Sequence, residues 1–298
     1  MTVAIATEFT NRVKRNEPMS RHTSWHVGGP AEVYYTPRDR ADLAAFLRSL
    51  APDVPIQWVG LGSNLLVRDS GIEGVVISTH GALDRLERIN ETTVYGEAGV
   101  LCARLAKQCV KWGLGPAEFF AGIPGTLGGA LAMNAGAFGG ETWTHVVEVE
   151  TIDRNGREHK RALSEYSVSY RHVTSPVVDE WFIAARLIFE RKPGVNDAEV
   201  RSLLERRKAT QPIGEWSCGS VFTNPPGDHA ARLVEASGLK GFRIGDASVS
   251  QKHANFIINH GSATAADLEQ LIHHVQETVE RLHGVRLNPE VRILGAAA

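Results

Sequence analysis

Cysteine is scarce in this chain, with three among 298 residues. An odd number cannot form a fully paired disulfide framework, so Cys102, Cys109 and Cys218 favour a reducing compartment. The first residues are too polar for a secretory signal peptide, and no apolar run approaches the roughly 20 residues of a membrane-spanning helix. We therefore expect a cytoplasmic protein with no membrane partner.

An excess of charge of one sign is also missing, because 32 Lys and Arg and 34 Asp and Glu give a net charge of -2. This balance argues against nucleic acid as the main partner. A small anionic ligand is compatible with it, because a site can be locally basic. The sequence has no phosphate-binding loop, and its histidines are not joined by Cys, Asp or Glu in a metal-ligand pattern, so we expect no metal site.

The pattern of apolar residues predicts an α+β chain without a regular βαβ rhythm. An Asn-Gly pair at 155–156 between alternating segments is a strong hairpin signal. Helices are expected after Asp39, over about 100–112 and over 264–284, and the composition shifts near 192–196, where we place a domain boundary. The last helix is expected to bury one apolar face: Leu268, Leu271, Ile272, Val275, Val279 and Leu282.

The most unusual feature is the stretch 121–141, AGIPGTLGGALAMNAGAFGGE, with seven glycines. Glycine weakens helix and strand interiors, so the stretch favours backbone that presses against a flat or phosphate-bearing ligand. The amides of 125–129 predict a short helix start directed at an anion. A second turn at 60–64, GLGSN, predicts an anion-binding nest, although Leu65 replaces the third glycine of a Rossmann fingerprint. A plain surface turn is the alternative for both segments.

Two further segments carry candidate chemistry. Ser220 stands on a small-residue turn in SCGSVFTNP, but Phe222 occupies the last glycine position of a nucleophile elbow, which disfavours a hydrolase. Cys218 is either a nucleophile or a buried filler, and we favour the filler. The segments SYRH and NPEVR add Arg171 and Glu290, which are also compatible with solvated charges.

Together these segments resemble one family. IPGTLGGALAMNAGAFG, GLGSNLLVRD, SYRH, SCGSVFTNP, LKGFRIGDASVSQKHANFIIN and LNPEVRILG are similar to segments of bacterial UDP-N-acetylenolpyruvoylglucosamine reductases (MurB). The resemblance runs from about Thr23 to Gly295, and the short interval between Arg171 and Ser220 is similar to the subclass without an inserted tyrosine-bearing loop. It implies an FAD enzyme that uses NADPH to reduce the enolpyruvyl group of a UDP-sugar to UDP-N-acetylmuramate, for peptidoglycan synthesis.

The resemblance also implies a domain organisation. An FAD-binding domain similar to that of vanillyl-alcohol oxidase and p-cresol methylhydroxylase (PCMH) is expected at 1–195, with α+β subdomains at about 1–85 and 86–195. A smaller α/β substrate-binding domain is expected at 196–287. Residues 288–298 would form a strand that returns Glu290 to the FAD domain. The FAD would be non-covalent, NADPH and substrate would use one flavin face in turn, and we favour a monomer.

Site residues follow from the same resemblance. The implied cofactor contacts are Gly60, Gly62, Ser63, Asn64, Leu65, Gly122, Ile123, Pro124, Gly125, Gly128, Gly129, Asn134, Ala135 and Gly136. The implied substrate contacts are Tyr170, Asn224, Lys252, His253 and Asn255. Lys240 and Arg243 are further candidates for its phosphates, or ordinary surface charges.

Three residues match the catalytic residues of the family. Arg171 would stabilise the negative charge that moves into the substrate carboxylate after hydride addition. Glu290 matches a glutamate with the same task, and we expect it to be protonated or to act through hydrogen bonding, because a carboxylate repels a developing dianion. Ser220 would donate a proton to the carbanion-like carbon beside the carboxylate.

The chain departs from the family pattern at Thr223, where lysine is common, at Val173, where serine is common, and at Trp216, where proline is frequent. These departures concern phosphate contacts and the surroundings of Arg171. Two other functions stay open at this point: another flavin oxidoreductase of this superfamily that acts on an alcohol or sugar, and a UDP-sugar-binding protein that has lost its cofactor.

Overall fold

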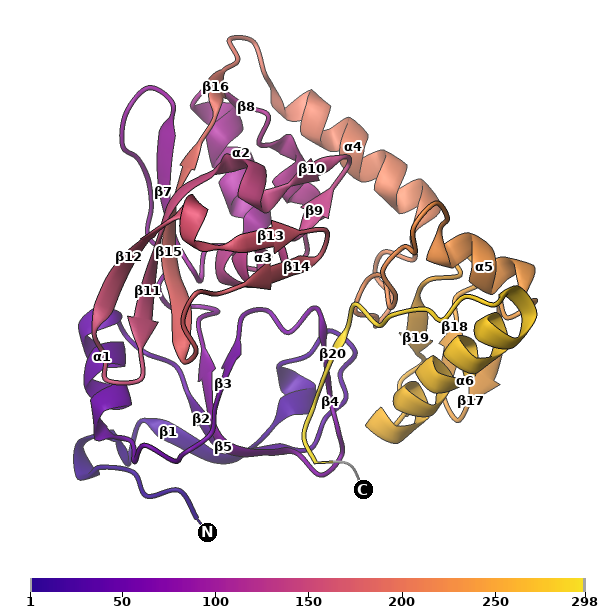
Figure 1. Cartoon of the computed structure of the whole chain (residues 1–298), viewed down its shortest axis with the longest axis horizontal. Helices are drawn as coiled ribbons and strands as arrows, with labels where there is room; N and C mark the ends of the chain where they lie inside the picture. Colours follow the sequence, from indigo (N-terminus) through magenta and orange to yellow (C-terminus); the bar gives the residue numbers. More distant parts are fainter. Residues whose placement is uncertain (1, 297–298) are drawn as a thin grey trace. The chain divides into compact units, whose positions relative to one another are not determined.

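The computed structural model describes residues 2–296 and has the α+β fold that the sequence predicts (Figure 1). The chain divides into two compact units, each described by itself below. The first unit contains the segments up to Lys14, Val33–Leu61 and Gly74–Arg206, and the second contains Arg15–Glu32, Gly62–Glu73 and the chain from Arg207 onward. The predicted domain limits remain a prediction, and residues 297–298 of the expected last strand lie outside the described residues.

The largest sheet lies in the first unit, with five strands in the order β12-β11-β15-β7-β6. All of its pairs are antiparallel. The strands are β6 Leu86–Arg88, β7 Thr93–Glu97, β11 Val146–Asp153, β12 Glu158–Ala162 and β15 Glu180–Ile188. The hairpin predicted at 155–156 is confirmed, and Gly156 has the left-handed φ of 67° that favours glycine there.

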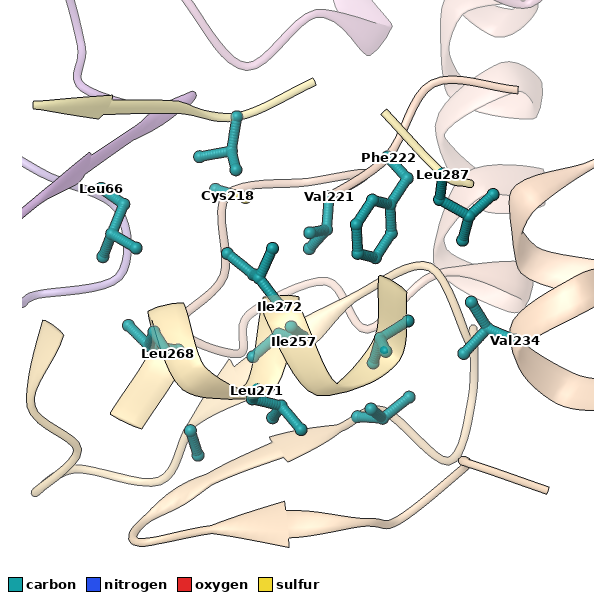
Figure 2. Close-up of a cluster of buried hydrophobic side chains, with 14 of the residues drawn as sticks. Leu66, Cys218, Val221, Phe222, Val234, Ile257, Leu268, Leu271, Ile272 and Leu287 are labelled. Carbon is teal, nitrogen blue, oxygen red and sulfur yellow. The ribbon is translucent and has the colours of Figure 1, made fainter. Parts of the chain in front are cut away.

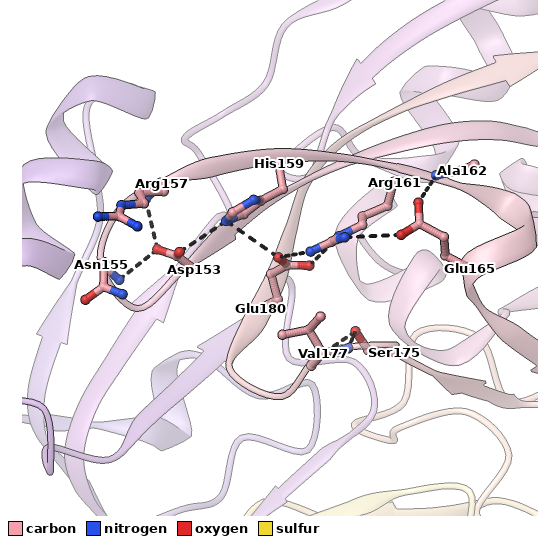
Figure 3. A network of polar contacts seen from close by, with 10 residues as sticks. All are labelled: Asp153, Asn155, Arg157, His159, Arg161, Ala162, Glu165, Ser175, Val177 and Glu180. Atoms are coloured by element: carbon pink, nitrogen blue, oxygen red, sulfur yellow. Dashed lines mark hydrogen bonds and ion pairs between the residues drawn. The ribbon is translucent and has the colours of Figure 1, made fainter.

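Ionic side chains reinforce one end of this sheet (Figure 3). Arg161 on β12 donates two hydrogen bonds to Glu180 on β15, of 3.0 and 2.9 Å, across the intervening strand β11. His159 lies 3.1 Å from Asp153 and 3.6 Å from Glu180. Burial is the largest single influence and raises the pKa of Glu180, but the hydrogen bonds and charge of Arg161, with smaller effects of Thr151 and His159, together bring this pKa below its ordinary value.

Three helices of the first unit lie where the sequence predicts helices. α1 Arg40–Ser49 begins at Asp39, whose side chain accepts a hydrogen bond from the amide of Asp42. α2 Cys102–Lys111 confirms the helix predicted at about 100–112. α3 Leu127–Met133 begins at Thr126, inside the glycine-rich stretch.

The shorter strands complete the chain. A four-stranded sheet has the order β1-β2-β5-β3, with β1 Val13–Pro18, β2 Pro30–Tyr35, β3 Ile56–Val59 and β5 Ile72–Ser78. Two-stranded pairs are formed by β8 Leu114–Gly115 with β16 Glu190–Arg191, β9 Gly136–Ala137 with β10 Gly140–Glu141, and β13 Ser167–Ser169 with β14 His172–Thr174. α4 Asp197–Thr210 contains the division between the two units.

The second unit is built on helix α6 Ala265–His283. It packs on the antiparallel sheet β17 Arg243–Ile244, β18 Ala247–Val249 and β19 Ile257–Asn259, and on α5 Ala230–Ala236. β20 Arg292–Leu294 pairs in parallel with β4 Leu65–Val67. The resemblance implies a returning C-terminal strand, but no sequence pattern indicates β4 as its partner. The caps at Thr264 and Gly284 are those predicted.

Apolar side chains of α6 form the core of this unit (Figure 2). Leu268, Leu271, Ile272, Val275 and Val279 are buried as predicted. Each such side chain contributes about 1.5–3 kcal/mol to stability by leaving water. The prediction is wrong for Leu282, which is 49% exposed because it lies in the last helical turn, beyond the packed core.

Candidate functional site

Arg171 of the first unit lies in the two-residue turn between β13 and β14. Its φ is 56°, a left-handed conformation that is unfavourable for a residue other than glycine. Its guanidinium donates hydrogen bonds to the main-chain oxygens of Asn134 (3.3 Å) and Gly136 (3.0 Å). Exposed Tyr170 lies beside it, with the guanidinium carbon 5.1 Å from the ring centroid. The turn therefore places a cation with a defined orientation.

Asn134 ends helix α3 in the left-handed conformation, with a φ of 45°. Its side chain is 2% exposed and is fully engaged inside the protein. The amide nitrogen donates to Glu141 (3.0 Å) and to the main-chain oxygen of Ser169 (3.1 Å), and the amide oxygen accepts from the backbone of Trp143 (3.1 Å). These internal bonds do not test the cofactor contact expected at Asn134, which stays a prediction.

Most glycines of the 121–141 stretch serve close packing within the first unit. A Cβ on Gly128 would lie 2.9 Å from Cβ of Ala98, and one on Gly140 would lie 2.6 Å from the ring of Phe119. Two amides at the start of α3 donate to backbone oxygens at 2.8 Å, Leu127 to Val100 and Gly128 to Ala98. These two donors are therefore bonded inside the protein, and an anion contact by the other amides of 125–129 stays a prediction.

Two glycines of the turn at 60–64 are required by close packing. In the first unit, a Cβ on Gly60 would collide with the hydroxyl of Thr126. In the second unit, a Cβ on Gly62 would collide with the main-chain oxygen of His22, and its φ of 69° also favours glycine. These positions need glycine whether or not a ligand is bound.

A buried hydroxyl beside Gly62 fits a ligand. The amide of Ser24 donates to the main-chain oxygen of Gly62 at 3.2 Å. Within residues 2–296, the buried Ser24 hydroxyl makes no hydrogen bond. An unsatisfied buried hydroxyl next to a turn of small residues suits a phosphate-bearing cofactor. No sequence pattern indicates Ser24, because an isolated serine has no spacing pattern.

The remaining predicted cofactor residues differ in exposure. The buried ones are Leu65, Gly122 and Ile123. The half-buried ones are Ser63, Asn64, Gly125, Gly128, Ala135 and Gly136, and the exposed ones are Pro124 and Gly129. Their contacts with a cofactor remain predictions.

Ser220 and Glu290 of the second unit lie on neighbouring backbone segments. The amide of Glu290 donates to the main-chain oxygen of Val221, the residue after Ser220, at 2.7 Å. The side-chain amide of Asn64 donates to the main-chain oxygen of Glu290 at 2.9 Å, and Arg292 donates back to Asn64 at 3.0 Å. Three segments far apart in sequence are thus joined at the candidate proton donor and carboxyl group.

Asn255 holds the segment after Ser220 from the other side. Its amide side chain both donates to the main-chain oxygen of Phe222 (2.8 Å) and accepts from its amide (3.0 Å). The main-chain oxygen of Asn255 accepts from Val221 at 2.9 Å. Asn255 is buried, so these bonds give it a place in positioning the Ser220 segment. Its predicted contact with substrate remains a prediction.

The thiol of Cys218 is buried in the same core as α6. Burial raises the pKa of Cys218 well above its ordinary value, and the nearby carboxyl of Glu290 adds to this effect. A protonated, buried thiol is a poor nucleophile, so the structure supports the filler interpretation. Cys102 and Cys109 are also free and buried.

Several candidates for substrate phosphate have internal partners. Lys240 pairs with Glu235 at 3.1 Å, and Arg243 pairs with Asp246 at 2.6 Å. The ammonium group of Lys252 donates to a main-chain oxygen of α4, that of Lys208. These contacts are those of surface charges, although a ligand can compete with them.

The other predicted substrate residues have mixed surroundings. The side chain of exposed Asn224 accepts a hydrogen bond from Ala230 at the start of α5 (3.1 Å). His253 is half-buried, and burial lowers its pKa, which favours a neutral ring. Trp216, at a position of departure from the family pattern, stacks on His26 with ring centroids 4.3 Å apart. The main-chain oxygen of Trp216 accepts a hydrogen bond from the amide of Asn259, the last residue of β19, at 2.9 Å.

Two family models match parts of this chain, and known relatives match nearly all of it. A family model described as UDP-N-acetylenolpyruvoylglucosamine reductase, C-terminal domain, matches residues 211–294, and one described as an FAD binding domain matches 31–161. A UDP-N-acetylenolpyruvoylglucosamine reductase of Alkalilimnicola ehrlichii is 60% identical over 284 residues, 94% of each chain. The chain belongs to the UDP-N-acetylenolpyruvoylglucosamine reductase family. A reductase of this name from Methylococcus capsulatus is 56% identical over 95% of this chain and 93% of its own.

A solved structure of the family has the same fold. The reductase (MurB) of Thermus caldophilus matches with a TM-score of 0.81 and 32% identity, over 95% of this chain and 99% of its own. Within residues 2–296 of this family member, no helix is both long and apolar enough to cross a membrane. In the same range, no three His, Cys, Asp or Glu side chains are placed to hold a metal ion.

Proposed function

We propose that this chain catalyses the NADPH-dependent, FAD-mediated reduction of UDP-N-acetyl-3-O-(1-carboxyvinyl)-glucosamine to UDP-N-acetylmuramate. The observation that carries the proposal is the 60% identity to a reductase of this name over 94% of both chains. The match of an FAD binding domain to residues 31–161 supports the cofactor. The product places the reaction in peptidoglycan precursor synthesis.

FAD, when bound, supplies hydride transfer from NADPH to the enolpyruvyl double bond. The protein residues then manage charge and protons. Arg171 binds the substrate carboxylate and stabilises the negative charge that grows there, since a guanidinium is always charged and donates in a planar fork. Its orientation is supported by the bonds to Asn134 and Gly136.

Ser220 donates its hydroxyl proton to the carbon beside the carboxylate, which completes the reduction. Glu290 assists at the carboxylate through a hydrogen bond. The backbone bond between Glu290 and Val221 supports a joint role, because it fixes the spacing of the two segments.

The binding of NADPH and substrate in turn, a monomeric state and a cytoplasmic location belong to the same proposal. The three free cysteines support a reducing compartment. We also propose Tyr170, Asn224, Lys252 and His253 as substrate contacts.

An anaerobic two-step titration tests the function. NADPH should bleach the yellow protein, and enolpyruvyl-UDP-N-acetylglucosamine should restore the oxidised spectrum with formation of one UDP-N-acetylmuramate for each flavin. Reduced enzyme that stays bleached after addition of this substrate would contradict the substrate assignment. Flavin that remains attached after acid precipitation, with peroxide formation from an alcohol or sugar, would favour the other flavin oxidoreductase.

A further inference from the structure

Asn134 contacts the guanidinium of Arg171 and also the strand residue that precedes the turn holding Arg171. Its main-chain oxygen accepts a hydrogen bond from the guanidinium (3.3 Å), and its side-chain amide donates to the main-chain oxygen of Ser169 (3.1 Å). Ser169 pairs with His172 at the base of the turn that holds Arg171. One buried residue therefore fixes both the backbone from which the arginine side chain leaves and the charged group at its end.

Glu141 orients the side chain of Asn134. Its carboxylate accepts from the same amide nitrogen at 3.0 Å, while the backbone of Trp143 donates to the amide oxygen at 3.1 Å. The carboxylate contact leaves one orientation of the amide, with nitrogen toward Ser169 and oxygen toward Trp143. A hydrogen bond to a charged acceptor is also stronger than one between neutral groups.

Glu141 also acts on the second acceptor of the guanidinium. It pairs with Gly136 in the two-stranded sheet β9–β10, and the main-chain oxygen of Gly136 accepts from Arg171 at 3.0 Å. A Cβ on Gly136 would lie 3.2 Å from the guanidinium nitrogen Nη1, so the approach is close. The two oxygens that accept from the guanidinium thus belong to Asn134 and Gly136, and Glu141 contacts both of these residues.

We propose that Asn134, oriented by Glu141, is a positioning residue for Arg171 and thereby sets the rate at which the substrate carboxylate is stabilised. This inference rests on the proposed function. The left-handed φ of Arg171 explains the need for such a device, because the turn is strained and would relax without outside contacts. A misplacement of about 1 Å costs up to about 10²-fold in rate.

Substitutions of Asn134 separate its side chain from its backbone. Asn134→Gly removes the amide and retains a residue that tolerates the left-handed φ. Asn134→Asp retains the shape but places a second carboxylate against Glu141. Adding Glu141→Gln to Asn134→Asp restores an amide–carboxylate contact with the polarity reversed. Thr144→Ala is the matched control, since it removes the hydrogen bond from the Thr144 hydroxyl to the main-chain oxygen of Glu141 (2.6 Å) and keeps the Glu141 carboxylate.

Stopped-flow measurement of the two half-reactions tests the proposal. In Glu141→Ala, reoxidation of reduced flavin by substrate should slow about 10- to 100-fold, while reduction by NADPH stays as in the unsubstituted enzyme. In Asn134→Gly, reoxidation should slow by a similar factor. Asn134→Asp should be equally slow, and the double substitution should recover part of the loss. Glu141→Gln alone and Thr144→Ala should react at nearly the original rate. Equal slowing of both half-reactions in Glu141→Ala, or unchanged reoxidation in Asn134→Gly, would overturn the proposal.

A second measurement does not depend on turnover. The ¹⁵N resonance of the Arg171 side chain, assigned by its loss in Arg171→Lys, should be narrowed or shifted by Asn134→Gly if the guanidinium gains motion. An unchanged resonance would overturn the positioning role. If the unsubstituted enzyme is not reoxidised by enolpyruvyl-UDP-N-acetylglucosamine, the proposed function fails, and this resonance still decides whether Asn134 holds Arg171.

Discussion

The two units hold their candidate catalytic groups by different means. In the first unit, Arg171 lies in a strained turn, and its side chain is directed by main-chain oxygens. In the second unit, Ser220 lies on a backbone segment that is bonded on both sides, to Glu290 and to Asn255. A long, flexible cation needs contacts at its far end, whereas a short hydroxyl is placed once its backbone is placed. The difference predicts that the two sites fail in different ways.

The largest effect should come from removing the hydroxyl itself. In Ser220→Ala, the flavin should still be reduced by NADPH, but reoxidation by substrate should slow about 10²- to 10⁴-fold, because no proton donor remains. Rapid-mixing absorbance of the flavin measures both steps. Ser217→Ala, in the same segment, should behave as the unsubstituted enzyme. Normal reoxidation in Ser220→Ala would exclude Ser220 as the donor.

The backbone support of Ser220 should be costly to remove. Asn255→Ala leaves the amide and the main-chain oxygen of Phe222 unsatisfied in a buried place, which should lower the free energy of unfolding by about 2–4 kcal/mol. Urea unfolding followed by fluorescence measures the change. Asn224→Ala, which removes one bond from an exposed side chain, should cost about 1 kcal/mol or less. Equal losses in the two variants would show that burial of Asn255 is unimportant.

Acid should destabilise the first unit through the Glu180 carboxylate. Glu180 in the first unit has a pKa below its ordinary value of about 4.3, since Arg161, Thr151 and His159 together outweigh the opposing effect of burial. A lowered pKa in the folded state stabilises the protein above the unfolded pKa, and this contribution is lost as the pH falls through the folded value. Thermal unfolding from pH 7 to pH 3 should therefore show a smaller acid-induced loss for Glu180→Gln. Its stability at pH 7 should be lower by about 1–2 kcal/mol. If the unfolding temperature of Glu180→Gln fell with pH in parallel with that of the unsubstituted protein, this role would be contradicted.

The smallest effect should come from removing the hydroxyl of Ser24. Stability without cofactor and affinity for FAD should change in opposite directions. Without cofactor, Ser24→Ala should leave the free energy of unfolding unchanged or slightly higher, because an unsatisfied buried hydroxyl is removed. With cofactor, FAD affinity should fall about 5- to 10-fold, since about 1 kcal/mol of hydrogen bonding is lost. Calorimetric titration of the apoprotein with FAD measures the affinity. An unchanged dissociation constant would show that the hydroxyl does not contact FAD.

Local signals in the sequence predicted local structure well. The Asn-Gly hairpin at 155–156, the caps of α6 and the α2 helix are each determined by a few neighbouring residues, and each is confirmed. Leu282 shows the limit, because periodicity gives the face of a helix but not where the core ends.

Long-range relations could not be read in this way. The parallel pair of β20 with β4 joins segments more than 200 residues apart, and no local pattern specifies it. The glycines of 121–141 favour a ligand surface when the sequence alone is considered, yet several are needed for packing against the protein itself, as Gly128 against Ala98 shows. Glu141 was missed for the same reason, since its role depends on a hydrogen bond to Asn134 that only the fold creates. The resemblance supplied Ser220, Arg171 and Glu290 as candidates but not the means by which each is held.

The buried thiols have a practical consequence. Burial raises the pKa of Cys102 and Cys109 in the first unit to about 12, and Cys218 in the second unit is equally withdrawn from solvent. An alkylating reagent should thus modify each cysteine only when its own unit opens. Mass spectrometry of the modified peptides would report the opening rate of each unit separately, with natural reporters already in place on both sides of the chain's division.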